Sequence, residues 1–519
     1  HFTYALLGDG DMMEGISSEA ASLAGHLKLG KLVFMYDAND ISLDGPNSLT
    51  FTEDVSARFE AFGWQVLHIA NGDTDLDAIE AALLEAKSET TRPSLIVVKT
   101  TIGYGSPNKA GTSGAHGAPL GADELKLTKA ALGVKTKAFG IEAEALEGFR
   151  ATRDRGEAAQ AGWNLALESW SGSHKALAKE WEMIQKGEFP NKWDAELPVH
   201  EAGSKIASRD AGHKALNAIA AKLPNLIGGD ADLSCSTKTF IKDGGDFEGQ
   251  GGTGRNIRYG VREHTMGAVA NGIAYHGGLR SFTGTFFVFS DYMRPAMRLA
   301  ALNHLPVTFV FTHDSIGVGE DGPTHQPIEH LASLRAMPGL VVIRPGDAEE
   351  TNEAWRYAMN EKQRPVTLIF SRQGLETVDR ETHASAEGLT KGAYTLSESK
   401  GMMKAVVIAT GSEVGLALAA QAQLHEEGVP TRVVSMPSWE LFEDQPEVYR
   451  EAILPTDVTA KVSVEAGCTF GWSKWIGDKG VAIGIDSYGA SAPANLLYEK
   501  FGVTVERVVS EVKKLTGKR

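Results

Sequence analysis

The chain has 519 residues and a formal net charge of −16, and 42% of its residues are hydrophobic and 23% charged. Its length predicts about three domains, and its acidic balance argues against nucleic acid as a partner, because binding to a phosphate backbone needs a basic surface. Two cysteines are too few for a disulfide framework and predict a cytoplasmic protein, and no apolar run approaches the ~20 residues of a membrane span.

The first predicted block is a strand, a helix and a second strand. Strands are expected at residues 3–7 and 32–36, and the helix at 15–26, where apolar residues recur at spacings of three and four. Such a unit is typical of a parallel sheet. A further strand at 95–100 precedes a glycine-rich loop at 103–121. Because the first strand starts almost at the first residue, we expect the chain to begin inside a domain.

Two more α/β blocks are predicted after a polar helical region at 140–195 and a linker from Pro190 to Pro198. The strands expected in the second block, from about 200 to 382, are 226–228, 282–285, 307–312 and 366–371. Those expected in the third block, from about 400, are 405–409, 432–435, 460–464 and 481–484. We therefore predict three α/β domains with mostly parallel sheets, spanning 1–195, 196–382 and 383–519.

Polar residues follow the first two predicted strands. Gly8, Asp9 and Gly10 come directly after the first strand, and Asn39 follows the second. In an open α/β sheet, ligands bind at the carboxyl ends of the strands. Mg²⁺ prefers hard oxygen ligands together with phosphate oxygens. Asp9 could give a carboxylate, Asn39 an amide oxygen and Ile41 a backbone carbonyl, although a plain Asp-Gly turn and a loop asparagine stay open as the alternative.

Glu263 lies just before an apolar helix predicted at 266–274. Taken alone, this position indicates a carboxylate that charges a helix N-terminus. Three aromatic residues downstream, Phe286, Phe289 and Tyr292, recur at a spacing of three, which predicts one side of a helical turn. Core packing is the simpler role for them.

Histidines and arginines mark a third group. His325 and Asp321 lie in the segment GEDGPTHQP, and His313 precedes it. The two histidines lack the spacing of a metal site. A neutral histidine can move protons near pH 7, although a structural role stays open for each. His116 lies between glycines on the loop at 103–121 and could reach a cleft. Arginines suit phosphate, because their planar donors match phosphate oxygens, and the candidates are Arg209 and Arg372.

The stretches LLGDGDMMEGISSEAASLAGHLKLGKLVFMYDANDISLDG, RYGVREHTMGAVANGIA and GEDGPTHQP strongly resemble the transketolase family. The resemblance covers essentially the whole chain and is weaker at 125–205 and 385–400. It implies a thiamine-diphosphate-binding fold with a partial diphosphate-binding domain (1–195), a pyrimidine-binding domain (196–382) and a C-terminal domain (383–519). Transketolases carry a further N-terminal segment, so the resemblance also implies a chain lacking the N-terminal part of its first domain.

The resemblance implies roles for single residues. Asp9, Asn39 and Ile41 would hold the metal, Mg²⁺ or Ca²⁺, that bridges the cofactor diphosphate. The other expected contacts of thiamine diphosphate are Gly8, Gly10, His116, Asp232, Glu263, Phe286, Phe289 and Tyr292. Glu263 would activate the aminopyrimidine ring as a partly buried carboxyl with a raised pKa. The expected sugar-phosphate contacts are Arg209, Ser236, His313, Asp321, His325 and Arg372, and the expected catalytic set is Glu263, His116, His325 and His313.

The function implied is transfer of a two-carbon ketol unit from xylulose 5-phosphate to ribose 5-phosphate or erythrose 4-phosphate, in the pentose phosphate pathway. Glu263 would serve a cofactor bound mainly by the partner subunit, which implies a homodimer with active sites at the subunit interface.

The alternatives are dihydroxyacetone synthase and a truncated, non-catalytic chain. A dehydrogenase is disfavoured, because no G-x-G-x-x-G follows a strand with an acidic residue about 20 positions on. Gly411 to Glu413 could be an anion site or a plain helix cap.

Overall fold

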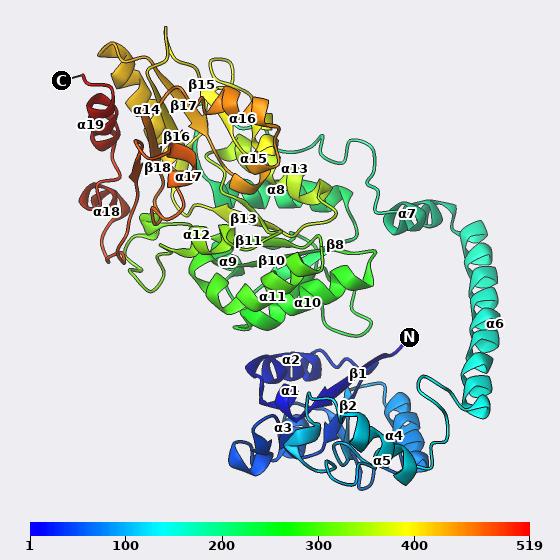
Figure 1. Cartoon of the computed structure of the whole chain (residues 1–519). Helices are drawn as coiled ribbons and strands as arrows, with labels where there is room; N and C mark the ends of the chain where they lie inside the picture. Colours follow the sequence, from blue (N-terminus) through cyan, green and yellow to red (C-terminus); the bar gives the residue numbers. More distant parts are fainter. Residues whose placement is uncertain (519) are drawn as a thin grey trace. The chain divides into compact units, whose positions relative to one another are not determined.

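The computed structural model describes residues 1–518 (Figure 1). The chain divides into two compact units. The first holds residues 1–182 with 248–252, and the second holds the rest of the described chain. Among residues 1–518, none of the helices combines the length and the apolar character needed to cross a bilayer.

The first unit is built on a four-stranded parallel sheet. Its strands, in their order across the sheet, are β1 (Thr3–Gly8), β2 (Leu32–Ala38), β6 (Ser94–Lys99) and β5 (Gln65–Ile69). A small hairpin pairs β3 (Ile41–Ser42) with β4 (Gly45–Pro46). The helices are α1 (Asp9–Met13), α2 (Gly15–His26), α3 (Val55–Ala61), α4 (Leu76–Ser88), α5 (Ala122–Ala131), α6 (Ala143–Ser173) and α7 (Lys175–Gln185), which ends in the second unit.

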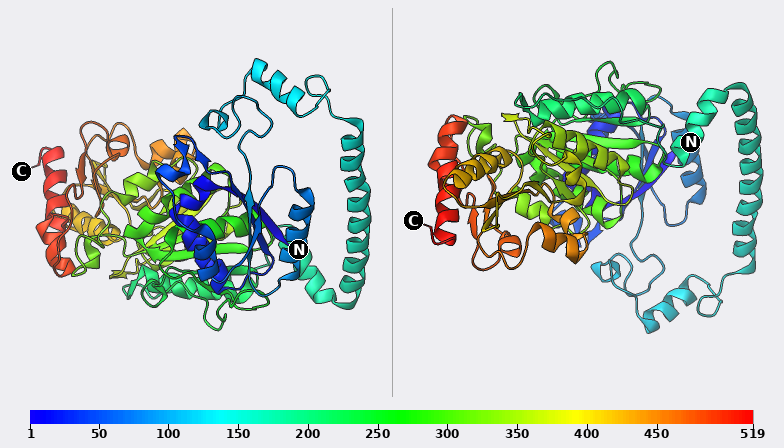
Figure 2. Two further views of the ribbon diagram at one scale, coloured as in Figure 1. Left: turned by 90° about the horizontal axis from the view of Figure 1, so that it is seen from below. Right: turned by 90° about the horizontal axis from the view of Figure 1, so that it is seen from above.

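The predicted strand–helix–strand unit is confirmed as β1, α2 and β2. The sequence did not indicate β5, whose polar residues Gln65 and His68 interrupt a short apolar run. The buried side chains of Phe59 and Trp64 pack under this sheet, and the Trp64 indole donates to the Ala21 carbonyl at 2.8 Å. In contrast, α6 stands clear of the sheet and has no buried residue (Figure 2).

The second unit contains a six-stranded parallel sheet with helices on both faces. Its strands, in order, are β12 (Val341–Ile343), β13 (Val366–Phe370), β11 (Thr308–Thr312), β10 (Arg280–Phe286), β8 (Leu226–Asp230) and β9 (Asn256–Arg258). The helices α10 (Glu263–His276) and α11 (Ser290–Leu302) cover one face, and α8 (Ser208–Lys222) and α13 (Ala348–Asn360) cover the other (Figure 1). Smaller elements are β7 (Lys205–Ala207), which pairs with β14 (Gly374–Glu376), and the helices α9 (Ser234–Thr237) and α12 (His330–Arg335).

The same unit ends in a five-stranded sheet. Its order is β15 (Tyr394–Ser397), β17 (Thr431–Ser435), β16 (Ala405–Ala409), β18 (Lys461–Val464) and β19 (Val481–Ile483), and only the edge strand β15 is antiparallel. The helices are α14 (Glu413–Glu426), α15 (Trp439–Glu443), α16 (Glu447–Ile453), α17 (Ser473–Ile476), α18 (Ala494–Lys500) and α19 (Val505–Leu515). Three mostly parallel α/β sheets are thus confirmed, while the domain boundaries near 195 and 382 stay predictions.

Two local predictions need revision. The segment 190–198 is not a free linker, because Trp193 is buried in the core beside β8 and Asp194 pairs with Arg356 at 2.7 Å. The start of α14 is not an anion site. There the buried carboxylate of Glu413 pairs with the buried guanidinium of Arg344 at 2.5 Å. The same guanidinium also pairs with the Asp314 carboxylate at 2.7 Å. Charged side chains of the protein fill this helix end, and Ser412 at the N-cap makes no side-chain capping hydrogen bond, so neither the anion site nor plain capping describes it.

Candidate active site

Asp9 is the centre of a polar cluster at the edge of the first sheet. It follows β1 and begins α1, and only 3% of its surface is exposed. Since β1 and β2 are parallel, with Gly8 opposite Asp37, the loop after β2 lies beside Asp9. Its carboxylate accepts hydrogen bonds from the Tyr36 hydroxyl at 2.5 Å and from the Asp40 amide at 3.0 Å. The juxtaposition predicted from the two strand ends is therefore found.

The loop that carries Asn39 and Ile41 is held in a defined shape. The Asn39 side-chain oxygen accepts a hydrogen bond from the Ile41 amide at 3.0 Å, and Asp40 adopts a left-handed φ of 62°. Burial and the hydrogen bond to Asp9 raise the pKa of Tyr36, so this hydroxyl remains a donor to Asp9.

The donors at this edge fit a divalent cation. The Asp9 carboxylate has about four lone-pair positions and uses two of them within the protein. Carboxylate, amide and backbone carbonyl oxygens are the hard ligands that Mg²⁺ and Ca²⁺ take. A Cβ added to Gly10 would meet no atom within 4 Å, so the backbone there is open to a ligand.

His116 lies on the loop that follows β6, the neighbour of β2 in the sheet. The loop turns through the short 3₁₀ helix η2 (Ser113–Ala115), and the His116 amide donates to the Ser113 carbonyl at 3.0 Å. The His116 side chain is half-buried, and within residues 1–518 no hydrogen bond joins it to Asp9 or Asn39. The structure thus places it on the predicted loop without a direct link to the cluster.

Glu263 is the first residue of α10 in the second unit, and 8% of its surface is exposed. The preceding turn passes through Gly260, whose φ of 63° lies in the left-handed region that favours glycine. A carboxylate that only charges a helix end is normally solvated, because burying an ionised group is costly. Glu263 thus lies at a buried helix start, and its role as the activating carboxyl stays a prediction.

The aromatic residues form a row, but not on one helical turn as predicted. Phe286 ends β10, Phe289 lies in the 3₁₀ helix η3 (Phe287–Phe289) and Tyr292 lies in α11. The Phe286 and Phe289 rings are nearly parallel, at an angle of 8° and with centroids 6.1 Å apart, and Tyr292 follows at 6.2 Å from Phe289. The chain changes from strand to helix within this segment, which a spacing of three does not reveal.

The two predicted histidines stand against this aromatic row. The His313 ring stacks on Phe286 with centroids 3.6 Å apart, and His325 meets the Phe289 ring edge-on at 5.7 Å. His313 has a φ of 62°, in the left-handed region that residues other than glycine adopt rarely, although histidine is among those found there more often.

A cationic cluster adjoins His313. Arg209 donates to the Ser236 carbonyl at 3.0 Å, and its guanidinium nitrogen lies 3.5 Å from the His313 ring. Burial, followed by the charges of Arg209, Arg372 and His325, lowers the pKa of His313 to about 3. The His313 ring is therefore neutral at pH 7, which favours hydrogen bonding over proton shuttling at this residue.

Asp321 and Asp232 occupy irregular segments at the carboxyl edge of the six-stranded sheet. Asp321 is exposed, and no hydrogen bond joins it to His325 within the described chain. Gln326 anchors the loop that carries Asp321 and His325. Its buried side-chain amide donates to the Gly319 carbonyl at 2.8 Å and to the Ala490 carbonyl at 2.9 Å. Asp232 has a left-handed φ of 64°.

Asp230 is a functional candidate that the sequence analysis missed. Its buried carboxylate accepts hydrogen bonds from the hydroxyls of Thr237 at 2.5 Å and Thr239 at 2.7 Å, and from the Leu233 amide. Burial raises its pKa to about 6. Asp230 thereby holds the loop that presents Asp232 and Ser236, beside a cavity of about 220 Å³. Its position at the end of a strand was the available signal.

A second group of metal-type ligands contains Asp291, Glu329 and His330. The His330 ring nitrogen lies 3.2 Å from the Asp291 carboxylate. This direct contact between the two side chains accounts for their proximity, and we assign no metal to the group.

Three family models match the chain. They are described as "Transketolase, thiamine diphosphate binding domain" over residues 1–190, "Transketolase, pyrimidine binding domain" over 204–377 and "Transketolase-like TK C-terminal domain" over 392–504. The first model covers the cluster around Asp9, and the second covers Glu263, the aromatic row and the cationic cluster.

Curated relatives match over the whole chain. A transketolase of Geobacillus stearothermophilus is 52% identical over 521 residues, covering 100% of this chain and 78% of the relative. A transketolase of Bacillus subtilis is 51% identical with the same coverage. Both matches extend through the cluster around Asp9, the aromatic row and the cationic cluster beside His313.

Solved structures match equally well. The transketolase of Leishmania mexicana has a TM-score of 0.95 and 44% identity, covering 100% of this chain and 76% of that chain. A transketolase of Pichia stipitis in complex with xylulose 5-phosphate has a TM-score of 0.95 and 41% identity, covering 99% of this chain and 76% of that chain.

Proposed function

The chain belongs to the transketolase family, and on that premise we propose that it transfers a two-carbon ketol unit from xylulose 5-phosphate to ribose 5-phosphate or erythrose 4-phosphate, in the pentose phosphate pathway. The reaction uses thiamine diphosphate and a divalent metal, Mg²⁺ or Ca²⁺. The observation that carries the proposal is the cluster of Arg209, Arg372 and His313 directly beside the stacked Phe286 ring. It puts a phosphate-binding group next to an aromatic surface suited to a flat cofactor ring.

The cationic cluster binds the substrate phosphate. Arg209 and Arg372 supply planar, permanently charged donors that match phosphate oxygens. Burial, followed by the charges of Arg209 and Arg372, lowers the pKa of His313, so the neutral imidazole can hydrogen-bond a phosphate dianion whose charge pairs with the two guanidinium groups. Ser236 supports the guanidinium of Arg209 through its carbonyl oxygen.

The Asp9 cluster holds the metal and the diphosphate. Asp9, Asn39 and Ile41 supply oxygen ligands, and the open backbone at Gly10, next to Gly8, admits the diphosphate. Thiamine diphosphate, when bound, supplies the electron sink that cleavage next to a carbonyl requires.

Glu263 would hold a proton against the pyrimidine ring nitrogen, and its position at the start of α10 is shielded from solvent. Phe286, Phe289 and Tyr292 would line the pyrimidine ring, and Asp232, on the loop that Asp230 holds, would contact the thiazolium side of the cofactor. His325 and Asp321 bind sugar hydroxyls, and His116 and His325 move protons at the reacting centre.

The enzyme acts as a homodimer in which Glu263 serves the cofactor bound mainly by the partner subunit. Supporting this, large apolar side chains on and around α10 and α11 are exposed, namely Val261, Tyr275, Tyr292, Leu299 and Leu302. Surfaces of this kind mark protein–protein contacts. A cytoplasmic location fits Cys235 and Cys468, which are free thiols.

The function is tested by ketol transfer from xylulose 5-phosphate to ribose 5-phosphate. We expect product with thiamine diphosphate and Mg²⁺ present, and none after both are removed by chelation and dialysis. Adding back both should restore the rate, whereas cofactor-independent transfer would refute the proposal. Formaldehyde offered as a competing acceptor separates this activity from that of dihydroxyacetone synthase. A chain that binds the cofactor but forms no product with either acceptor would be the non-catalytic alternative.

Replacing Arg209 by glutamine should lower kcat/KM for xylulose 5-phosphate by about 10²-fold, mainly through KM, because charge-assisted hydrogen bonds contribute about 1.5–3 kcal/mol each. Unphosphorylated xylulose lacks the group that Arg209 binds, so its kcat/KM should change by less than about threefold. Arg153→Gln, on the exposed helix α6, is the matched control. Equal losses for both sugars would show that Arg209 does not act on the phosphate.

A further inference from the structure

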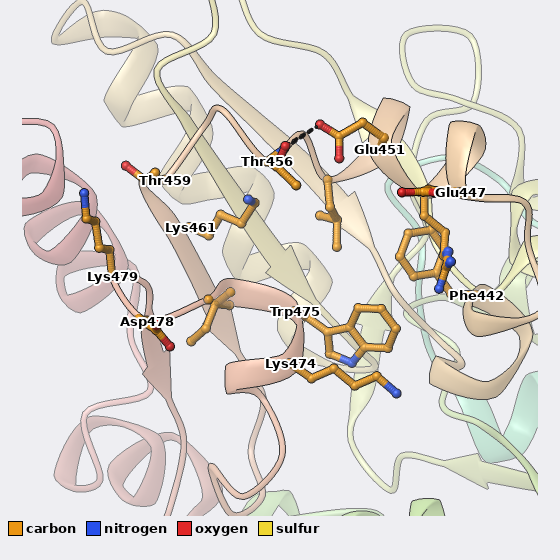
Figure 3. A pocket seen from close by; sticks show the side chains of 14 residues that line it. Phe442, Glu447, Glu451, Thr456, Thr459, Lys461, Lys474, Trp475, Asp478 and Lys479 are labelled. Carbon is orange, nitrogen blue, oxygen red and sulfur yellow. Dashed lines mark hydrogen bonds between the residues drawn. The ribbon is translucent and has the colours of Figure 1, made fainter.

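A cavity of about 520 Å³ lies in the C-terminal part of the second unit, remote in sequence from every residue of the proposed active site (Figure 3). Its apolar wall consists of Phe442, Leu454, Trp475 and Ile476, which come from α15 to α17 and their connections. This size is typical of cavities that take small-molecule ligands, about 300–1,000 Å³. The ketol-transfer reaction gives this cavity no role.

A buried cation lines the cavity. Only 7% of Lys461 is exposed, and its ammonium donates to the Pro455 carbonyl at 2.7 Å. An ammonium has three donors, and within residues 1–518 no carboxylate lies within ion-pair distance of this one. Burial lowers the pKa of Lys461, against the opposing effect of Glu451 and Asp457. A buried charge with so few partners is costly unless an anion joins it.

Two side chains that line the cavity, Arg450 and Trp475, each carry a donor nitrogen without a hydrogen-bond acceptor in the described chain. The buried Nε of Arg450 and the buried Nε1 of Trp475 make no hydrogen bond within the described chain. Trp475 is 9% exposed. Both nitrogens are closed off from solvent, so they do not face the cavity, and a ligand would meet Arg450 only through the rest of its partly exposed side chain.

The acidic groups of the cavity are Glu447, Glu451 and Asp478. Glu451 already accepts hydrogen bonds from the Thr456 amide at 2.7 Å and the Thr456 hydroxyl at 2.8 Å, as Figure 3 shows for this pair. Lys474, the other cation near Trp475, is paired with Glu443. Arg450 and Lys461 are thus the cations in the cavity that remain available, together with the exposed Lys479.

We propose that this cavity binds a small organic anion, a phosphate monoester or a carboxylate, whose charged head contacts Lys461 and Arg450 and whose flat apolar body lies against Trp475. The site is separate from the ketol-transfer centre and adds a ligand-binding function to the C-terminal domain. Phosphate and carboxylate share the anionic oxygens that these donors need.

Isothermal titration of the full chain with phenyl phosphate and with phenylacetate tests the proposal, with benzyl alcohol as the neutral analogue. We expect at least one of the two anions to bind and benzyl alcohol to give no heat. Lys461→Met keeps the apolar stem and removes the charge, so it should weaken binding by at least about tenfold. Lys500→Met, an exposed position outside the cavity, should leave the affinity unchanged. Arg450→Gln, at a partly exposed position on α16, gives a second test should Lys461→Met fold poorly.

Binding at the proposed phosphate cluster must be told apart from binding here. Arg209→Gln should leave the affinity for phenyl phosphate at the cavity unchanged. Loss of binding in Arg209→Gln with retention in Lys461→Met would overturn the proposal, as would equal binding of benzyl alcohol or no heat with either anion at millimolar concentration. This readout does not depend on catalysis, so it stands whether or not the chain transfers ketol units.

Discussion

Replacing Glu263 by glutamine should lower kcat for ketol transfer by about 10³-fold, because a positioned acid or base contributes about 10²–10⁴ in rate. Glutamine has nearly the same shape and can still occupy the buried position at the start of α10, but it has no acidic proton to hold at a ring nitrogen. The measurement is the initial rate with both sugar phosphates, thiamine diphosphate and Mg²⁺ at saturation. Under these conditions a lower rate reports the chemical step rather than weaker binding.

Two controls accompany this variant. Glu499→Gln, an exposed glutamate on α18, should keep the full rate. Glu263→Gln itself should keep the thermal midpoint and the far-ultraviolet circular dichroism of the parent. A folded Glu263→Gln variant with more than about a tenth of the parent rate would exclude the activating role, since a positioned acid or base contributes at least about 10²-fold.

Replacing Asp9 by asparagine should raise the concentrations of Mg²⁺ and thiamine diphosphate needed for half-maximal activity by at least about 10²-fold, because even indirect partners of a metal contribute about 10–100-fold in affinity. The change removes a charged oxygen ligand. It also sets an amide nitrogen against either the Tyr36 hydroxyl or the Asp40 amide, which now donate to the two carboxylate oxygens at 2.5 and 3.0 Å. Fluorescence titration of cofactor at fixed Mg²⁺, and of Mg²⁺ at fixed cofactor, measures both effects.

Asp44→Asn is the matched control for Asp9, because Asp44 is an exposed aspartate in the hairpin that follows Ile41. It should leave both half-saturation concentrations unchanged. Unaltered Mg²⁺ dependence in Asp9→Asn would remove Asp9 from the metal site. In that event, the hydrogen bonds from Tyr36 and Asp40 would be the whole explanation of its burial.

The metal-type cluster was the part of the site most accessible from the sequence. Gly8 to Gly10 and Asn39 follow two strands whose apolar pattern is unambiguous, and parallel pairing of neighbouring strands brings their carboxyl ends to one edge. The hydrogen bond from the Asp40 amide to Asp9 follows from that topology. Resemblance to the transketolase family added the roles of the single residues, which strand patterns do not encode.

The aromatic and cationic clusters show where sequence reasoning stopped. A spacing of three placed Phe286, Phe289 and Tyr292 on one helical turn, whereas they span a strand end, a 3₁₀ turn and a helix. The stack of His313 on Phe286, at 3.6 Å, joins the end of β10 to the residue that follows β11. Asp230 was overlooked, because its importance comes from burial and from three donors contributed by the loop after β8.

By itself, the sequence determined the three mostly parallel α/β sheets and the family, because both depend on local apolar periodicity and on contiguous motifs. Only the tertiary structure decided the environment of each charged group. In the folded chain Glu263 is buried, and Lys461 lies in a cavity without a carboxylate partner. Burial and the charges of two arginines lower the pKa of His313 to about 3. Desolvation and Coulomb interactions act across space between residues distant in the chain, so no local pattern records them.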